Sequence, residues 1–157
     1  MDPLLDLAER AAAHLTGTGQ VLIVRERTVT AQGAEQRLRH TFTAVHGDRA
    51  WAETTDRTDD SALRAAARTA SRMAQGRRAW RSGGLPHTAA PAPPTEVDER
   101  LFGLTPAQVG SIDGEYERRT TPLRGLAPAG PAAVVTAEVA IASTLGVRQY
   151  ERRAHLR

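Results

Sequence analysis

The sequence of 157 residues contains no cysteine and no lysine. Without cysteine the chain has no disulfide framework, no zinc site made of thiolates and no cysteine nucleophile, which fits a reducing compartment. Without lysine it has neither the lysine of a phosphate-binding P-loop nor one that could form a Schiff base. The cytoplasm is therefore the expected location.

Aromatic residues are also scarce, with two each of Trp, Tyr and Phe. The pI of about 10.4 looks basic, but it is raised by the exclusive use of arginine as the cation. The 18 acidic residues are interspersed among the 21 arginines. Nucleic-acid binding usually needs clustered cations and aromatic stacking platforms. We therefore expect nucleic acid to be an unlikely partner.

Long apolar runs are missing from the chain. The longest ones are rich in alanine and are interrupted by Arg, Glu or Gly every few residues, and the N-terminus carries Asp2 and Asp6 early. A membrane-spanning helix needs about 20 predominantly apolar residues. A signal peptide needs a continuous apolar region after a basic start. We expect neither.

Two segments have the apolar periodicity of helices. Asp2 followed by Pro3 is typical of an N-cap and first helical residue, and the apolar spacing predicts a helix to about Leu15. Thr58 or Asp59 can cap a second helix. Its predicted apolar stripe is Leu63, Ala66, Ala67, Ala70, Met73 and Ala74. Its predicted solvated side carries Arg64, Arg68 and Arg72.

Several segments have the composition or alternation of strands. Residues 20–31 are rich in β-branched side chains, and the apolar run 21–24 is continuous, so we expect that half to be covered on both faces. Further strands are predicted at residues 38–44, 50–54, 135–141 and 147–156. The last two form a hairpin around Leu145 and Gly146.

Two segments are expected to be loops, at residues 82–98 and 122–131, because both are rich in Gly and Pro. Between them, Thr105, Pro106 and Gln108 are typical of a capped helix start, but Gly110 and Gly114 predict that this helix is short. The whole pattern predicts one α+β domain over residues 1–157, with a flexible loop at about 82–98. We expect an antiparallel-rich mixed sheet, two main helices packed on it and a C-terminal hairpin.

The histidines do not form a metal site in the sequence pattern. A zinc hydrolase helix places two His one turn apart, with a Glu nearby as base. Here His40 and His46 are six residues apart, across a strand and into a turn, and His14, His87 and His155 are isolated. We expect structural or solvated histidines and no bound metal or cofactor.

Other catalytic patterns are equally incomplete. No serine lies in a Gly-x-Ser-x-Gly nucleophile elbow. The carboxylate pairs Asp59–Asp60 and Glu115–Glu117 could assist acid and base chemistry in a pocket. The first pair is better explained by a helix N-terminus, which favours negative charge, and the second by a polar connecting segment. No catalytic residue is therefore assigned.

The order of segments resembles the N-terminal domain of the TldD/PmbA (TldE) family. Residues 4–11 resemble the family's opening helix, and residues 21–25 its first strand. Residues 46–56 resemble the turn, strand and cap before its Ala- and Leu-rich second helix, and residues 137–147 its late hairpin. The segment 104–131 departs from the family, being shorter and richer in Gly and Pro than the family's long middle helix.

The resemblance implies peptide processing by a two-subunit zinc metalloprotease in which the PmbA-like subunit lacks metal. The family's C-terminal domain, which carries a His-Glu-x-x-x-His motif in the catalytic member, has no counterpart in this sequence. The resemblance therefore implies a non-catalytic subunit that binds a TldD/PmbA-type partner, a second copy of itself or a peptide substrate. The alternatives are an independent basic module for an acidic protein or nucleic acid, and a degenerate remnant with no activity.

Two surfaces are candidates for such partner contact. One is the arginine side of the second helix, and the other is the final strand, which ends the chain at a sheet edge. The candidate contact residues are Arg64, Arg68, Arg72, Arg148, Tyr150 and Arg152. Each surface has a plainer explanation as well: a solvated helix face in one case, and charged side chains that guard an edge strand against pairing in the other.

Overall fold

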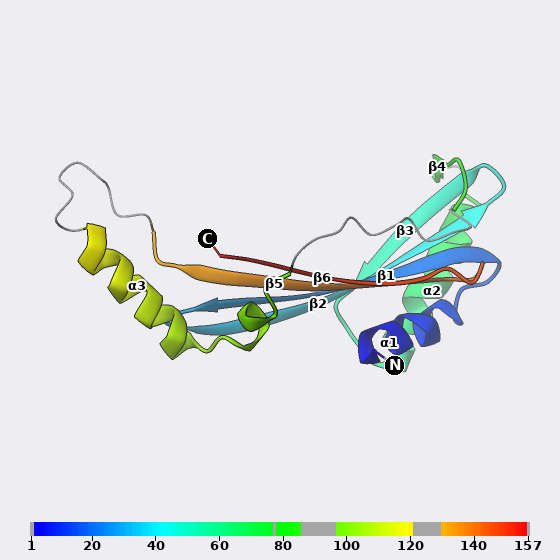
Figure 1. Ribbon diagram of the computed structural model, residues 1–157. Helices are drawn as coiled ribbons and strands as arrows, with labels where there is room; N and C mark the ends of the chain where they lie inside the picture. The colour runs from blue at the N-terminus through cyan, green and yellow to red at the C-terminus, as the bar shows by residue number, and fades with distance from the viewer. Residues whose placement is uncertain (1, 77, 86–96, 121–129, 157) are drawn as a thin grey trace. The chain divides into compact units, whose positions relative to one another are not determined.

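The computed structural model describes residues 2–76, 78–85, 97–120 and 130–156. In these ranges the α-helices are α1 (Pro3–Ala12), α2 (Asp60–Ala74) and α3 (Pro106–Thr120), with a 3-10 helix η1 (Glu99–Gly103) before α3 (Figure 1). The strands are β1 (Thr18–Thr30), β2 (Gly33–His46), β3 (Arg49–Thr55), β4 (Trp80–Arg81), β5 (Ala133–Ser143) and β6 (Arg148–Leu156).

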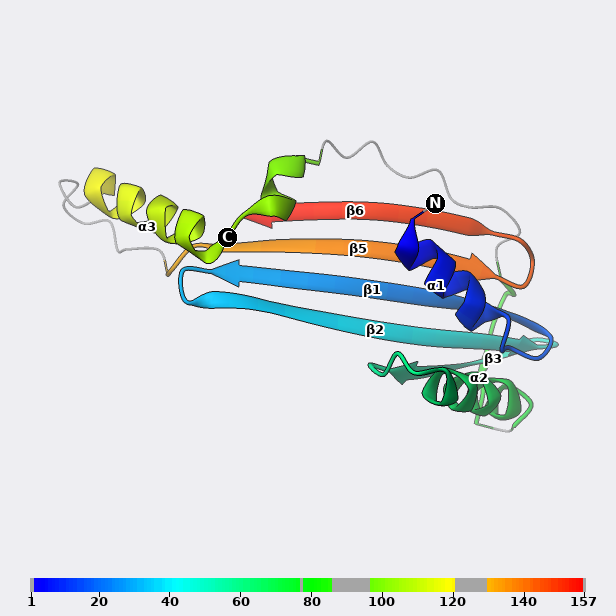
Figure 2. The ribbon, with the colours of Figure 1, turned by 90° about the horizontal axis from the view of Figure 1, so that it is seen from below.

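The strands form a six-stranded sheet in the order β4-β3-β2-β1-β5-β6. β2 pairs antiparallel with β3, and β3 with β4. The arrowheads in Figure 2 show that β2, β1, β5 and β6 also alternate in direction. The predicted α+β class, the antiparallel sheet with helices packed on it and the C-terminal hairpin are confirmed.

The chain divides into two compact units, which are described separately. Unit 1 comprises residues 1–25, 38–93 and 138–151, and unit 2 comprises residues 26–37, 94–137 and 152–157. Strands β1, β2, β5 and β6 each contribute residues to both units.

Both main helices of unit 1 begin at an aspartate cap. Asp2 Oδ1 accepts a hydrogen bond from the backbone N–H of Leu4 at 2.9 Å, and Asp59 Oδ1 accepts one from Ala62 at 3.0 Å. Such caps satisfy backbone donors that a helix leaves unpaired in its first turn. The predicted cap at Asp2 is confirmed, and Asp59 rather than Thr58 caps α2.

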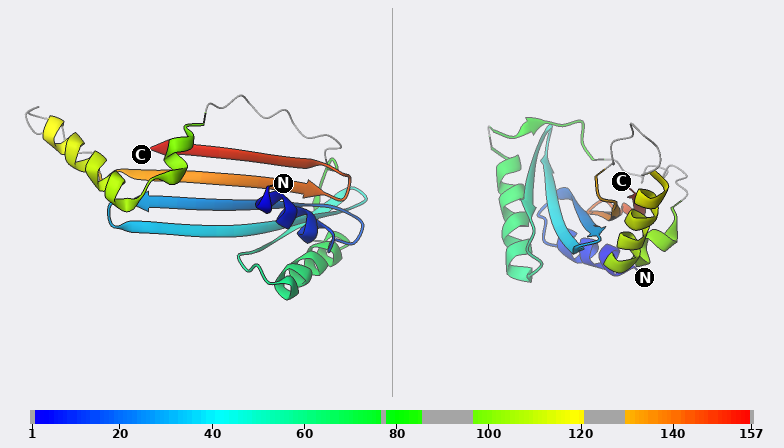
Figure 3. Two further views of the ribbon diagram at one scale, coloured as in Figure 1. Left: turned by 60° about the horizontal axis from the view of Figure 1, so that its bottom comes forward. Right: turned by 90° about the vertical axis from the view of Figure 1, so that its left-hand side faces the viewer.

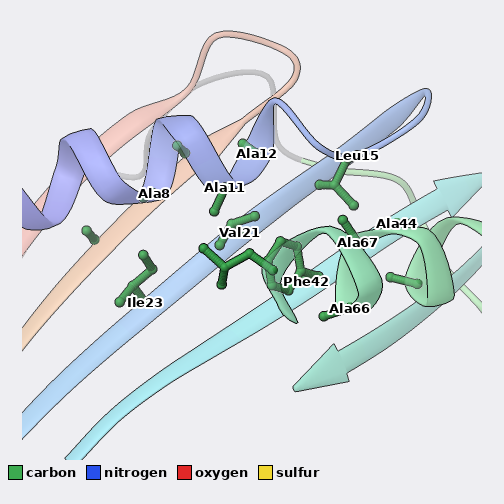
Figure 4. Close-up of a cluster of buried hydrophobic side chains, with 14 of the residues drawn as sticks. Ala8, Ala11, Ala12, Leu15, Val21, Ile23, Phe42, Ala44, Ala66 and Ala67 are labelled. Atoms are coloured by element: carbon green, nitrogen blue, oxygen red, sulfur yellow. The ribbon is translucent and has the colours of Figure 1, made fainter. Parts of the chain in front are cut away.

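The core of unit 1 lies between the sheet and these two helices. Figure 4 shows alanines of α1 and α2 packed around Val21, Ile23 and Phe42, and all three of these side chains are fully buried. Figure 3 shows α2 lying alongside β3. Because small alanines let the helices approach closely, few large side chains are needed here. The buried residues of this core are Leu4, Ala8, Ala11, Ala12, Leu15, Val21, Ile23, Phe42, Ala44, Leu63, Ala66, Ala67, Ala70, Ala74, Ala140 and Ala142.

Two expectations about unit 1 are wrong. Met73 is only half-buried, and Ser71 occupies the buried position, where its Oγ accepts a hydrogen bond from the backbone N–H of Thr16 at 3.2 Å. The run 21–24 is not covered equally on both faces. Val21 and Ile23 are fully buried, whereas Leu22 and Val24 are half-buried, because both described helices of unit 1 lie on one side of the sheet (Figure 2).

Unit 2 has a smaller core of three fully buried valines, Val29, Val109 and Val134. Leu101, Leu104 and Ala132 pack against them. The capping residues predicted before α3 are confirmed, because Thr105 N–H donates to Gln108 Oε1 at 2.9 Å and Gln108 N–H donates to Thr105 Oγ1 at 3.4 Å. Each side chain thus satisfies a backbone donor of the other residue.

The prediction that α3 would be short is wrong, since α3 continues through Gly110 and Gly114 to Thr120. Gly110 lies beside the β1–β2 turn, where a Cβ at this position would make an ordinary van der Waals contact with the Cβ of Ala31 at 3.4 Å. Asp113 contributes a further tie, because its Oδ1 accepts a hydrogen bond from Ala132 N–H at 2.6 Å.

The predicted loops fall largely outside the described residues, which omit 86–96 and 121–129. The short strand β4 just before the first of them was not predicted. It pairs with β3 through Ala50 and Trp80, and the Trp80 ring stacks on Trp51 with centroids 6.3 Å apart. This pairing is long-range, so local propensity does not indicate it.

Candidate functional site

A polar network in unit 1 links side chains on three adjacent strands. Glu138 of β5 accepts from Arg25 Nε of β1 at 2.6 Å and from the Tyr150 hydroxyl of β6 at 2.6 Å. The Glu138 side chain is 19% exposed and that of Arg25 is 32% exposed. The hydrogen bond to Glu138 raises the pKa of Arg25 above its ordinary value, although burial opposes the shift.

Strand alternation explains which side of the sheet this network occupies. Arg25 follows Val21 and Ile23 at two-residue spacing, so it points to the side that carries the helices. The negative charge of Asp2, at the start of α1, also favours charged Arg25. Arg25, Glu138 and Tyr150 therefore bond to one another. These bonds fit a role in holding the three strands and α1 in place better than a role in proton transfer.

The predicted contact residues of α2 lie on its exposed side. Arg64, Arg68 and Arg72 are all exposed, at one-turn spacing. Arg64 Nε lies 2.7 Å from Asp60 Oδ2, an (i, i+4) ion pair within the helix. Such exposed pairs contribute little to stability because water and salt screen them. The three arginines thus form a cationic stripe on the exposed side of α2.

Arg148 is the first residue of β6, an edge strand of the sheet, and forms an ion pair with Glu9 of α1 beside the β5–β6 turn. The pair borders a recess of about 280 Å³. Ala12 and Ala13 at the end of α1, together with the residues of the turn and its flanking strands, provide most of its lining. Gly146, with φ of +84°, supplies the left-handed residue that this turn requires. The recess is mostly apolar with one ion pair at its rim.

Arg152 belongs to unit 2, where sequence reasoning did not foresee its partners. Its guanidinium forms an ion pair with Glu99 and lies 3.8 Å from the centroid of the Phe102 ring. Arg27 of β1 joins this group by donating to the carbonyl oxygens of Phe102 at 3.0 Å and Leu104 at 3.1 Å. No local sequence signal marks Arg27, because its partners lie some 75 residues away.

The six predicted contact residues therefore do not assemble into one site. Three lie on α2, two lie on β6 in unit 1, and Arg152 lies in unit 2. Within the described ranges, no three His, Asp or Glu side chains gather as a metal site would require. None of the helices in the described part of the chain combines the length and apolar character needed to cross a membrane.

His40 is the one fully buried histidine in the described residues. Neither ring nitrogen has a hydrogen-bond partner of good geometry among them. Burial lowers the pKa of His40, and the backbone of its cross-strand neighbour Thr55 offsets this only in part. His46 is exposed at the end of β2, six residues along the same strand from His40, so the two rings are held apart as the sequence predicts.

Comparison with family models and with curated protein sequences finds no match. Solved structures do match. TldE from Thermococcus kodakarensis superposes with a TM-score of 0.62 at 12% identity, over 96% of this chain. A proposed modulator of a DNA gyrase from Thermotoga maritima gives 0.65 at 9% identity over 88%, and one from Bacteroides thetaiotaomicron gives 0.67 at 10% over 99%.

The chain has a TldD/PmbA-like fold. At 9–12% identity the likeness concerns the fold alone. The chain spans 37%, 33% and 40% of the lengths of these three proteins, so it corresponds to well under half of each.

Proposed function

We propose that this chain is a non-catalytic, TldE-like component of a TldD/PmbA-type peptide-processing system. The observation that supports this is the fold likeness, which extends over 88–99% of this chain but only 33–40% of the matched proteins. A domain of this kind supplies binding surface, and the reactive groups then belong to the zinc-bearing partner. The cytoplasm, as expected for a cysteine-free chain, is the proposed location.

The charge distribution of the described residues fits a binding role. Glu138 and Glu9 are engaged with arginines, and Asp60 with Arg64 and His14, so these carboxylates stabilise structure instead of serving as free acids or bases. The α2 stripe of Arg64, Arg68 and Arg72 offers positive charge on one exposed surface. An acidic surface on a TldD-type protein is the complementary contact.

Co-purification tests the proposal. The tagged chain is co-expressed with a His-Glu-x-x-x-His protein of the TldD type from the same genome, and we expect a stable complex with a defined mass. Changing Arg64, Arg68 and Arg72 together to Gln should weaken the complex by about tenfold, because steering charges are lost. Arg10→Gln is the matched control, since Arg10 is exposed on α1. Failure to form any complex would refute the proposal.

Zinc content and peptidase activity test the proposal that this chain is non-catalytic. The chain purified alone should hold no stoichiometric zinc and cleave no peptide, and both properties should appear only with the TldD-type protein. Metal analysis that finds one zinc tightly bound per isolated chain would contradict this.

The alternative, a basic module for nucleic acid or an acidic protein, is favoured by the same α2 stripe. Binding to a nucleic acid would release counterions, so the affinity would fall steeply as salt rises. A titration of labelled DNA or RNA between low and physiological salt distinguishes it from the first proposal. Strong salt-dependent binding that the triple Gln variant abolishes would favour the alternative.

A further inference from the structure

The two tryptophans of the chain form one aromatic pair where β4 joins β3 in unit 1. Trp51 in β3 is half-buried and packs against the unit 1 core, and its indole N–H donates to Glu53 Oε2 at 3.5 Å. The Trp80 ring stacks on Trp51 with the two planes inclined by 30°, and Trp80 is 47% exposed. Trp51 thus anchors the pair, and Trp80 presents an aromatic surface on which a further flat ring can stack.

Two arginines lie beside this aromatic pair. Arg49 and Arg81 are directly opposed in the antiparallel pairing of β3 with β4, next to the opposed residues Ala50 and Trp80. Directly opposed side chains leave the same side of a sheet, and like charges in that arrangement repel each other. Arg49 Nη1 donates to Gly76 O at 3.0 Å, which holds its guanidinium just beyond the end of α2. An anion between the two guanidinium groups would relieve their repulsion.

Few acids balance the cations of this edge. Residues 46–52 and 78–82 carry one acid, the exposed Asp48, against three arginines, Arg49, Arg78 and Arg81. Arg78 and Arg81 are exposed, and neither has a carboxylate partner among the described residues. The β3–β4 edge therefore combines a positive charge with an uncovered aromatic ring.

This combination is the one that binds a phosphate together with a flat base. Arg49 and Trp51 are two residues apart on β3, about 6.6 Å along the strand, which a base and its own phosphate can bridge. We propose that the β3–β4 edge binds a nucleotide unit, whose base stacks on Trp80 and whose phosphate lies between Arg49 and Arg81. The unit belongs either to a single-stranded nucleic acid or to a free nucleotide. A duplex is a poor ligand, because its bases are already stacked on one another.

Composition alone argues against such a site, because the chain has few aromatic residues. The fold changes this argument, since it brings both tryptophans and three arginines to one edge of unit 1. The site is distinct from the arginine stripe of α2 and does not depend on the proposed function.

Tryptophan fluorescence reports on this site directly, because both tryptophans of the chain lie in it. The full chain is titrated at low salt with a strand of about ten thymidines, a length within the usual range for single-strand sites. Thymidine monophosphate, a duplex of the same length and inorganic phosphate are titrated in parallel. The strand should quench the fluorescence, whereas the duplex should bind at least tenfold more weakly and phosphate alone should not quench.

The monophosphate distinguishes the two sources of the nucleotide unit. Binding of the strand at least tenfold tighter than that of the monophosphate, at equal concentration of nucleotide units, assigns the site to single strands. Equal binding of the two assigns it to free nucleotides. Both results support a site for a base with its phosphate.

Two variants test the two parts of the site, with a labelled strand followed by fluorescence anisotropy. Trp80→Leu should weaken binding by about 10- to 100-fold, because one stacked base is lost. Arg81→Gln should weaken it by about three- to tenfold and reduce the slope of log affinity against log salt by about 0.7, since one phosphate contact is lost. Arg10→Gln is the matched control, because it removes an exposed cation of α1 and should bind within about twofold of the wild type. Circular dichroism checks that each variant keeps its fold.

A third variant separates this site from the α2 stripe. Changing Arg64, Arg68 and Arg72 together to Gln should leave binding of the strand within about threefold of the wild type. Trp80→Leu, in turn, should leave the complex with a TldD-type protein intact. Failure of this proposal and failure of the proposed function are therefore seen in different variants.

Three results would overturn the proposal. The first is a wild-type chain whose fluorescence is quenched by neither the strand nor the monophosphate at about 1 mM nucleotide, on the order of a weak ligand's dissociation constant. The second is a Trp80→Leu variant that binds the strand as tightly as the wild type does. The third is binding that the triple Gln variant abolishes and Arg81→Gln leaves unchanged, which would place the ligand on α2.

Discussion

Arg27 Nη1 in β1 donates a hydrogen bond to the carbonyl oxygen of Phe102 at 3.0 Å, and thereby ties η1 to the sheet within unit 2. A second bond to Leu104 O at 3.1 Å uses the other terminal nitrogen. Two parallel bonds from one planar guanidinium fix direction as well as distance. The geometry makes Arg27 the residue that orients the segment leading into α3.

Arg27→Leu should therefore loosen this segment. It leaves two partly buried carbonyl oxygens without their donor, which costs about 1–3 kcal/mol for an unsatisfied group. Hydrogen exchange should speed up at residues 99–105, and chemical denaturation should show lower stability. Arg37→Leu is the matched control, because Arg37 is exposed and contacts only Glu35 among the bonds described for it. Equal exchange in both variants would contradict the assignment.

Leu63→Ala in α2 should lower the free energy of unfolding by about 2–5 kcal/mol, because Leu63 is 4% exposed in the unit 1 core and its loss leaves a cavity. Met73→Ala should cost less, since Met73 is only half-buried. Arg68→Ala on the exposed side should change stability by no more than about 0.5 kcal/mol. Urea denaturation measures the free energy of unfolding of all three variants. A different order of the three losses would contradict the assignment of buried and exposed faces to α2.

Gly19→Ala should destabilise unit 1 by about 1–3 kcal/mol through overpacking. A Cβ at this position would lie 2.7 Å from Leu15 Cδ1 and 2.8 Å from the carbonyl oxygen of Thr43. The backbone oxygen cannot move aside as a flexible side chain could. Gly33→Ala is the control, because no atom lies within 4 Å of a Cβ there. Thermal melts that shift equally for both variants would argue against the close approach.

His40 should make unfolding pH-dependent. Because burial lowers its pKa in the folded state, the ring is neutral there while the unfolded chain takes up a proton below about pH 6.5. Stability should be fully present above that pH and decline as pH falls, by at most about 1.4 kcal/mol per pH unit. His40→Gln should flatten the profile between pH 7 and 5. A wild-type profile already flat over that range would exclude this role.

Local pattern alone predicted the elements whose signals lie close together in the chain. The caps at Asp2, Asp59 and Thr105 depend on contacts within four residues, and the alanine stripe of α2 is visible in the spacing of its residues. The final hairpin similarly follows from alternation on either side of a glycine turn. Backbone and capping preferences act over this short range, so the class of fold could be inferred from them together with the family resemblance.

Tertiary structure decided everything that depends on which distant segments meet. Sequence could not show that Leu22 and Val24 face away from both helices, that Gly110 fits against Ala31, or that Arg27 holds Phe102. Each depends on strand register and helix placement, because a side chain's burial and its partners are set by neighbours far away in the chain. The positions of the arginines along the chain therefore indicated the candidate surfaces. The fold determined which residues lie next to these arginines and which of them form ion pairs.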